Sequence, residues 1–110
     1  MDDATARTQL ESMLAELDRS IKVLRGDSVM VGDRSAADAG SDLTDADRRQ
    51  AMNDVATRQR TAVLDALKRL DAGVYGRCVD CRTPVPEGRL AARPEAARCV
   101  QCQSRRERRR

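Results

Sequence analysis

The feature that most constrains this chain is a pair of C-x-x-C motifs near its C-terminus. Cys78 and Cys81 form the first pair, Cys99 and Cys102 form the second, and together they are all the cysteines of the sequence. Each C-x-x-C turn directs two sulfurs toward one point, and two such turns complete the tetrahedral coordination that Zn²⁺ adopts in proteins. The spacing therefore predicts one zinc ion held by four thiolates. No ligand position is left for water, so the predicted zinc is structural and not catalytic.

Three other uses of four cysteines fit the sequence less well. Two disulfides would require an oxidising compartment, and nothing in the sequence points to one. A redox-active C-x-x-C pair is expected beside a βαβ pattern, which this sequence does not show. An iron–sulfur cluster also takes four cysteines, but its characteristic spacings differ from this one. Structural zinc remains the expectation.

The composition limits how large a hydrophobic core the chain can form. Among 110 residues, Tyr75 is the one aromatic residue, and 35% of the residues are charged. Such a chain suits long helices that pack through Leu, Val, Met and Ala, with zinc stabilising the remainder. The sequence shows neither an N-terminal apolar signal segment nor an apolar run of membrane-spanning length. We expect a cytoplasmic monomer, in a compartment where thiols stay reduced and available to metal.

An amphipathic helix is predicted from the N-terminus to Gly26. Asp2 and Asp3 can cap its start, and Gly26 is a typical stop. Its apolar residues recur at alternating steps of four and three, which places them on one face. They are Leu10, Leu14, Leu17, Ile21 and Leu24.

A second helix is predicted from near Thr44 to the turn at Gly73. Thr44 and Asp47 resemble a capping box, and Gln59 is a polar interruption in an otherwise apolar seam. The seam consists of Met52, Ala56, Gln59, Val63, Ala66 and Leu70. Two such helices joined by one loop are expected to fold as an antiparallel coiled-coil hairpin.

The mainly α fold is predicted to have two parts. Residues 1–76 form the hairpin, with an acidic tip loop at about 26–43. Residues 77–110 form a small four-cysteine zinc finger with a short basic C-terminal helix and tail. Pro84, Pro86 and Gly88 are expected to keep the segment between the cysteine pairs irregular.

The charges are distributed unevenly along the chain, whose formal net charge is +3. The stretch 27–47 holds six aspartates against Arg34 alone, whereas ten arginines follow from Arg77 onward. The hairpin therefore has an acidic tip, and the zinc end is basic. The chain has no His, no paired nucleophile and base, and no glycine-rich phosphate loop, so we expect no enzymatic activity.

The cysteine motifs belong to a longer pattern. The chain shows Tyr75-Gly76-x-Cys78-x-x-Cys81 and then Arg89-Leu90-x-Ala92-x-Pro94-x-Ala96-x-x-Cys99-x-x-Cys102. This pattern resembles the zinc finger of the DksA/TraR family, whose members are bacterial regulators that bind RNA polymerase rather than DNA. The resemblance covers about the last third of the chain. One departure is Arg82, where the family usually has Gly, and a positive φ there would strain the arginine.

The resemblance also gives the acidic tip a role. In the family, the hairpin is inserted through the secondary channel of the polymerase, and a D-x-x-D-x-A motif at its tip lies close to the catalytic centre. Asp42 and Asp45 occupy the two acidic positions here, and Asp47 replaces the alanine. The family resemblance also implies guanosine tetraphosphate, the signal of the stringent response, as a candidate partner.

Two other functions are compatible with the sequence. The finger and the Arg-rich C-terminus could clamp nucleic-acid phosphates, although the finger has no aromatic residue for base stacking and the acidic hairpin would repel phosphate. We expect no sequence-specific DNA binding and no membrane partner. A structural zinc protein that releases its metal on thiol oxidation is the third alternative.

Overall fold

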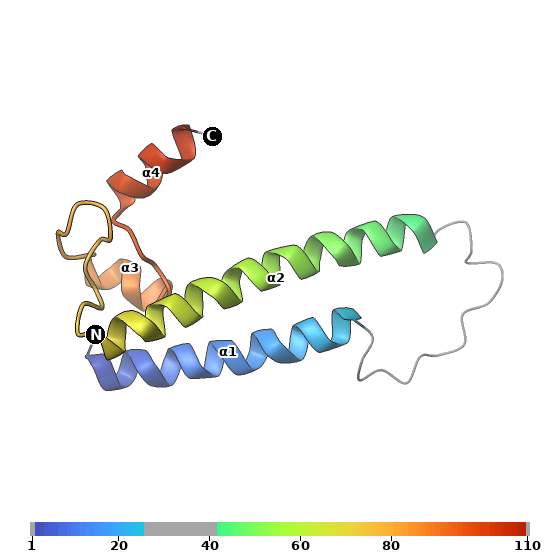
Figure 1. Cartoon of the computed structure of the whole chain (residues 1–110), viewed down its shortest axis with the longest axis horizontal. Coiled ribbons are helices and arrows are strands. Elements are labelled where there is room, and N and C mark those ends of the chain that lie inside the picture. The colour runs from blue at the N-terminus through green and yellow to red at the C-terminus, as the bar shows by residue number, and fades with distance from the viewer. Residues whose placement is uncertain (1, 26–41, 110) are drawn as a thin grey trace.

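The computed structural model describes residues 2–25 and 42–109, with the main chain alone at positions 42 and 43. Within these ranges the chain forms α1 (Asp3–Arg25), α2 (Asp42–Asp71), α3 (Glu87–Ala92) and α4 (Val100–Arg108) (Figure 1). An isolated antiparallel bridge joins Arg77 to Pro84. The predicted mainly α fold is confirmed. None of the helices in the described ranges combines the length and apolar character that a membrane crossing needs.

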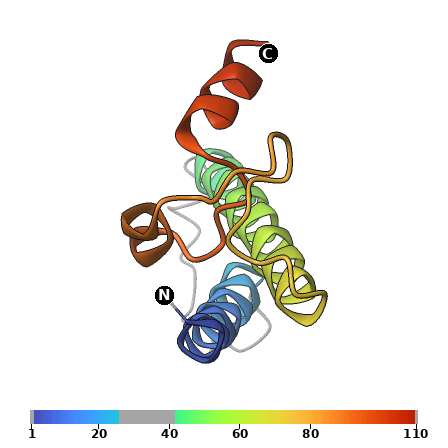
Figure 2. The same cartoon turned by 90° about the vertical axis from the view of Figure 1, so that its left-hand side faces the viewer.

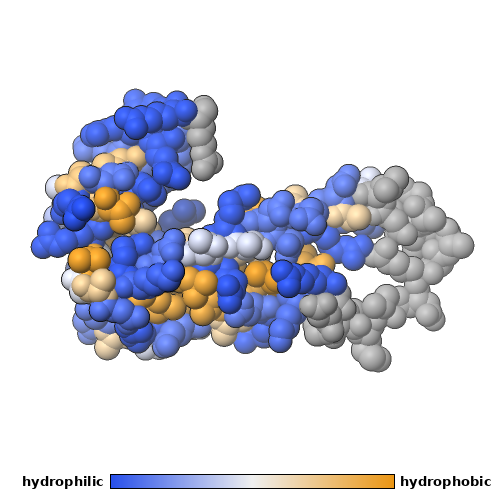
Figure 3. Space-filling view, in the orientation of Figure 1, coloured by the Kyte–Doolittle hydropathy of each residue, from blue (hydrophilic) through white to orange (hydrophobic). Residues whose placement is uncertain are grey.

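α1 and α2 lie side by side and antiparallel, as the heptad-like seams predict (Figures 1 and 2). Apolar side chains fill the band between them (Figure 3). Leu10 and Val63 are fully buried, and Ala6 and Ala66 are small enough to let the helix backbones approach. The hairpin core comprises Ala6, Leu10, Val63, Ala66 and Leu70, with Met13, Leu14, Leu17, Leu67 and Tyr75 packed against it.

The far half of the hairpin is packed less completely than its seam predicts. Ile21 and Ala56 are buried, but Met52 is 53% exposed and Gln59 lies at the surface. The prediction that these two residues belong to the buried seam is therefore wrong. The physical reason is the small side chains at this part of the contact, which leave an open groove of about 400 Å³ between the helices. The groove is lined by Leu17, Ser20, Leu24, Ala51, Met52, Val55, Ala56 and Gln59.

The helix ends follow local chemistry. Asp2 Oδ1 accepts a hydrogen bond from the Thr5 backbone N–H at 2.7 Å, which is an N-cap of α1. At the end of α2, the Val74 N–H donates to Arg69 O, and the Gly73 N–H donates to Leu70 O with Gly73 at φ 76°. This pair of bonds is a Schellman motif, and its left-handed residue is the glycine that the sequence supplies.

The start of α2 differs from the prediction. The helix begins at Asp42, so Thr44 and Asp47 both lie inside it and the predicted capping box is wrong. Positions 42 and 45 fall in the first turn, where a negative charge interacts favourably with the helix dipole. This charge effect favours an earlier start than the capping-box spacing suggested. The rest of the predicted tip loop, residues 26–41, lies outside the described residues.

The segment between the cysteine pairs is more regular than predicted. Pro86 precedes α3, and its carbonyl accepts hydrogen bonds from the Arg89 and Leu90 backbone N–H groups. A proline at this point leaves no helix hydrogen bond unmade, and Leu90 is buried, so the turn is anchored. The expectation of an irregular loop was therefore wrong for residues 87–92.

Tyr75 joins the hairpin to the finger. Its ring packs against the hairpin core and also against a second cluster formed by Cys78, Val85, Leu90 and Cys102. Its hydroxyl donates to Pro94 O at 2.9 Å. Tyr75 thus packs in the cores of both the hairpin and the finger. The domain boundary predicted between residues 76 and 77 stays a prediction. α4 points away from the end of the hairpin (Figures 1 and 2).

Candidate zinc site

The structure brings the four cysteines into one cluster. Their sulfurs all lie within 4.8 Å of one another, and Cys81 Sγ is 3.8 Å from Cys99 Sγ. In a tetrahedral site with Zn–S bonds of about 2.3 Å, neighbouring sulfurs are about 3.8 Å apart. The four thiols are not linked as disulfides. The geometry therefore fits a single zinc ion.

Backbone hydrogen bonds hold the first pair in place. The Cys78 N–H donates to Thr83 O at 2.8 Å, and the Arg82 N–H donates back to Cys78 O at 3.0 Å. These bonds close a tight turn over Cys81, beside the Arg77–Pro84 bridge. The turn holds the two sulfurs of the first pair close together in the folded finger.

The second pair is placed by α4. Cys99 is the N-cap residue of this helix, and its carbonyl accepts a hydrogen bond from the Gln103 N–H at 2.9 Å. Cys102 therefore lies in the first turn of α4, three residues from Cys99, where the two side chains share a face. A hydrogen bond from the Val79 N–H to Ala97 O, 2.9 Å long, joins the two halves of the site.

Local donors prepare the first pair for metal. Burial opposes ionisation of Cys78, but backbone N–H groups of Cys81, Cys99 and Asp80 outweigh it and lower the pKa of this thiol to about 6. The Thr83 hydroxyl, 2.9 Å from Cys81 Sγ, lowers the pKa of Cys81. Both changes favour the thiolate form that zinc requires.

Cys102 behaves in the opposite way. Its interaction with the Cys99 side chain, assisted by burial, raises the pKa of Cys102 to about 12. The hydrogen bond with Cys99 favours the protonated thiol, so Cys102 keeps its proton until a cation compensates the charge of the thiolate. Zinc binding at this site must therefore release a proton.

Arg82 has the backbone conformation that its position suggested. Its φ is 67°, in the left-handed region that glycine adopts freely and other residues adopt at a cost. The conformation is imposed from both sides, by the Arg82 N–H bond to Cys78 O and by an Arg77 Nη1 bond to Arg82 O at 3.3 Å. The expected strain at this position is confirmed.

Side chains that the sequence did not single out hold the two cysteine pairs together. Arg98 Nε lies 2.8 Å from Asp80 Oδ2 in an ion pair, and Arg89 Nε donates to Arg98 O at 3.0 Å. Asp80 lies within the first C-x-x-C motif and Arg98 directly precedes the second. An acidic residue inside one C-x-x-C motif and a basic residue next to the other is the sequence pattern that could have predicted this ion pair.

Comparison with known proteins identifies this region. Residues 73–108 match the family model of the prokaryotic dksA/traR C4-type zinc finger. This part of the chain is a DksA/TraR zinc finger. Its four cysteines bind one zinc ion, as the spacing predicted. No curated protein sequence matches the chain significantly.

The similarity to DksA proteins extends beyond the finger. A solved structure, that of transcription factor DksA2 from Pseudomonas aeruginosa, superposes with a TM-score of 0.69. The alignment covers 97% of this chain and 81% of that chain, at 25% sequence identity. The hairpin and the finger therefore share one overall fold with a DksA protein.

The tip acids predicted by resemblance lie at the end of α2 that is farthest from the finger (Figure 1). Asp42 is the first residue of the helix, and Asp45 and Asp47 are exposed. Positions 42 and 45 are one turn apart, whereas position 47 lies about 140° around the helix from position 42. Asp47 therefore does not continue the line of the first two positions. The role of the three acids stays a prediction.

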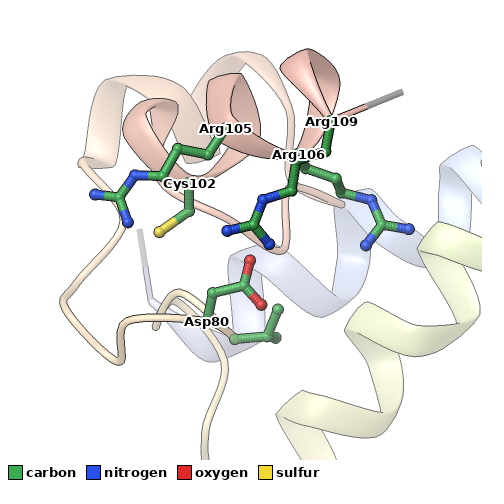
Figure 4. Close-up of a pocket in the computed structure, with 6 residues that line it drawn as sticks. Asp80, Cys102, Arg105, Arg106 and Arg109 are labelled. Atoms are coloured by element: carbon green, nitrogen blue, oxygen red, sulfur yellow. The ribbon is translucent and has the colours of Figure 1, made fainter.

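The basic end of the molecule has a pocket of about 650 Å³ between α4 and the first cysteine turn (Figure 4). Arg105, Arg106 and Arg109 lie on one side of it, and Asp80 lies opposite. All three arginines are exposed. The α4 arginine pocket, as these residues are called below, gives the finger a positively charged surface beside its metal site.

Proposed function

We propose that this protein is a transcription regulator that binds RNA polymerase directly. The observation that carries the proposal is the combined match of its finger to the DksA/TraR family and of its whole fold to transcription factor DksA2. A finger alone would be compatible with many partners. A finger joined to a hairpin of this kind is an arrangement that the chain shares with a transcription factor.

The proposed mechanism uses the length of the hairpin. α2 has 30 residues and so spans about 45 Å. If the finger rests on the rim of the secondary channel, this length carries Asp42 and Asp45 deep into the channel, toward the catalytic centre. There the carboxylates modulate initiation by interacting with basic residues or Mg²⁺ of the polymerase. The protein itself performs no chemistry and is not an enzyme.

The finger end supplies most of the proposed binding surface. The α4 arginine pocket attracts acidic surface of the polymerase, and Asp80 within it makes the pocket less suited to nucleic-acid phosphates. For this reason a direct role in DNA binding is not proposed. We place the protein in the cytoplasm as a monomer, with guanosine tetraphosphate as a candidate second signal.

The experiment that tests the proposal measures polymerase affinity and the effect on transcription separately. In the double variant Asp42→Asn and Asp45→Asn, two charges are removed while side-chain size is kept. Polymerase affinity is expected to change less than about threefold, since two charges at the far end of the hairpin contribute little to binding. The effect on transcription in a purified initiation assay is expected to fall by about tenfold or more. Equal loss of affinity and effect would show that the tip is only an anchor.

A paired variant tests the residue that departs from the family motif. Asp47→Ala restores the family residue and removes an exposed charge. We expect a stronger regulatory effect with unchanged polymerase affinity. The matched control is Asp54→Ala, an exposed aspartate further along the same helix, which should change neither quantity. An unchanged transcription effect in both variants would place Asp47 outside the tip contacts.

A further inference from the structure

A second basic pocket, of about 300 Å³, lies where α2 meets the first cysteine turn. It is distinct from the α4 arginine pocket and shares only Val79 with it. Its lining residues contribute three guanidinium groups and no carboxylate. They are Arg69, Val74, Arg77, Cys78, Val79 and Arg82.

Arg69 is the residue that points to a ligand. It is half-buried, and its Nε atom is buried without a hydrogen-bond partner in the described part of the chain. Its Nη2 makes only a long bond of 3.4 Å to Ala96 O. Burial is the main reason why the pKa of Arg69 is lowered. A buried donor without an acceptor is unfavourable, so the site lacks a partner that could accept this bond.

Two nearby carboxylates are paired elsewhere, and Asp65, whose negative charge acts on Arg69, makes no hydrogen bond with its Nε. Asp80 pairs with Arg98, and Asp71 pairs with Arg7 at 2.6 Å. Among the described residues, neither Arg77 nor Arg82 forms an ion pair. A zinc centre of four thiolates and one Zn²⁺ carries a formal charge of −2 and offsets part of the positive charge. None of the cysteine sulfurs, however, lies within hydrogen-bond distance of Arg69 Nε.

We propose that this pocket binds a phosphate-class oxyanion. Guanidinium groups present planar pairs of donors that match phosphate oxygens, and three of them suit a dianion with several acceptors better than a monovalent carboxylate. Val74 and Val79, which are 47% and 38% exposed, add an apolar wall. The volume suits a phosphate group with a small organic substituent. The site goes beyond the proposed function and requires no polymerase.

Arg82 distinguishes this pocket from the usual DksA/TraR pattern. It is the arginine that replaces the glycine of the DksA/TraR pattern, and it holds a positive φ that costs stability. A guanidinium retained at a strained position is consistent with a role in binding. The same fact provides a clean variant, because Arg82→Gly removes one ligand and relieves the strain at once.

The test uses the zinc-loaded full chain and the Arg69 Nε–Hε signal in ¹H–¹⁵N NMR spectra. Inorganic phosphate and phenyl phosphate are titrated at constant ionic strength, with chloride and acetate as reference anions. We expect a saturable shift of the Arg69 signal with both phosphates. In Arg82→Gly the affinity should fall about tenfold, while the protein becomes more stable to heat. Unfolding cannot explain a loss of affinity in a stabilised variant.

Arg106→Gln is the matched control, since it removes the same charge from the other pocket. It should leave phosphate binding unchanged. Tighter binding of phenyl phosphate than of inorganic phosphate would identify an organic phosphate ester that uses the valine wall, and equal binding would identify free phosphate. The proposal is overturned if the Arg69 signal does not saturate, if acetate competes equally, or if Arg106→Gln has the larger effect. None of these results bears on polymerase binding, because the assay contains no polymerase.

Discussion

The hairpin and the finger lie end to end but are stabilised in different ways. The hairpin core consists of apolar side chains alone, contributed by both helices. In the finger, two of the four buried residues of the core cluster, Cys78 and Cys102, are metal ligands. A segment of fewer than about 40 residues rarely folds on hydrophobic burial alone. The finger therefore depends on its zinc, whereas the hairpin has its own packing.

The largest expected effect comes from removing a zinc ligand. Cys99→Ser should abolish stoichiometric zinc binding and unfold the finger, since zinc binding contributes on the order of 10 kcal/mol in small zinc domains. Most of the helical circular dichroism should remain, because α1 and α2 account for most helical residues. Metal analysis and circular dichroism check both points. Collapse of the helical signal would show that the hairpin also depends on the metal.

The converse change acts on the hairpin. Leu10 is fully buried between the helices, so Leu10→Ala should reduce the free energy of unfolding by about 2–5 kcal/mol. Denaturant unfolding followed by circular dichroism measures this loss, and zinc content should stay at one per chain. The control is Val23→Ala on the same helix, where the side chain is 56% exposed and the loss should be below about 0.5 kcal/mol. Loss of zinc in Leu10→Ala would contradict the independence of the two regions.

A smaller effect is expected at the contact between the regions. Tyr75→Phe keeps the ring in both cores but removes the hydrogen bond to Pro94 O. We expect a loss of about 1 kcal/mol, confined to the finger. Amide hydrogen exchange should become faster around α3 and stay unchanged in the middle of α1. Faster exchange throughout the hairpin would show that Tyr75 stabilises the whole molecule.

An effect of similar size, but a gain of stability, is expected at Arg82. Arg82→Gly should stabilise the finger by about 1 kcal/mol, because glycine adopts φ 67° without steric cost. Thermal unfolding of the zinc-loaded protein measures the gain. Arg77→Gly provides the contrast, since Arg77 has no positive φ and the glycine should destabilise by adding freedom to the unfolded chain. Equal effects of the two substitutions would show that φ at position 82 is not strained.

The sequence predicted the features that depend on spacing. Four cysteines at the right intervals implied the zinc site, and apolar steps of three and four implied the hairpin. The strain at Arg82 followed from one substitution in a known pattern. These features are local, or repeat with a fixed period, so one sequence carries them.

Other features depend on how segments meet in space. The exposure of Met52 follows from small side chains on both helices that leave a groove beside it, and Ser20 on α1 is distant in sequence. The helix after Pro86 forms because Leu90 finds a buried place against the cysteines. The buried Arg69 Nε results from α2, the cysteine turn and the Ala96 segment converging. Such tertiary contacts override local propensity and require the structure.

The continuity of α2 has a mechanical consequence. The helix runs without interruption from Asp42 to the turn that precedes Tyr75, and no flexible joint separates the acidic end from the metal end along it. The helix therefore moves as one rigid rod when it rotates about Tyr75. Over its length of about 45 Å, a rotation of about 5° would displace the far end by about 4 Å. A ligand that tilts the finger by about 5° would therefore displace the acidic end by more than the length of a hydrogen bond.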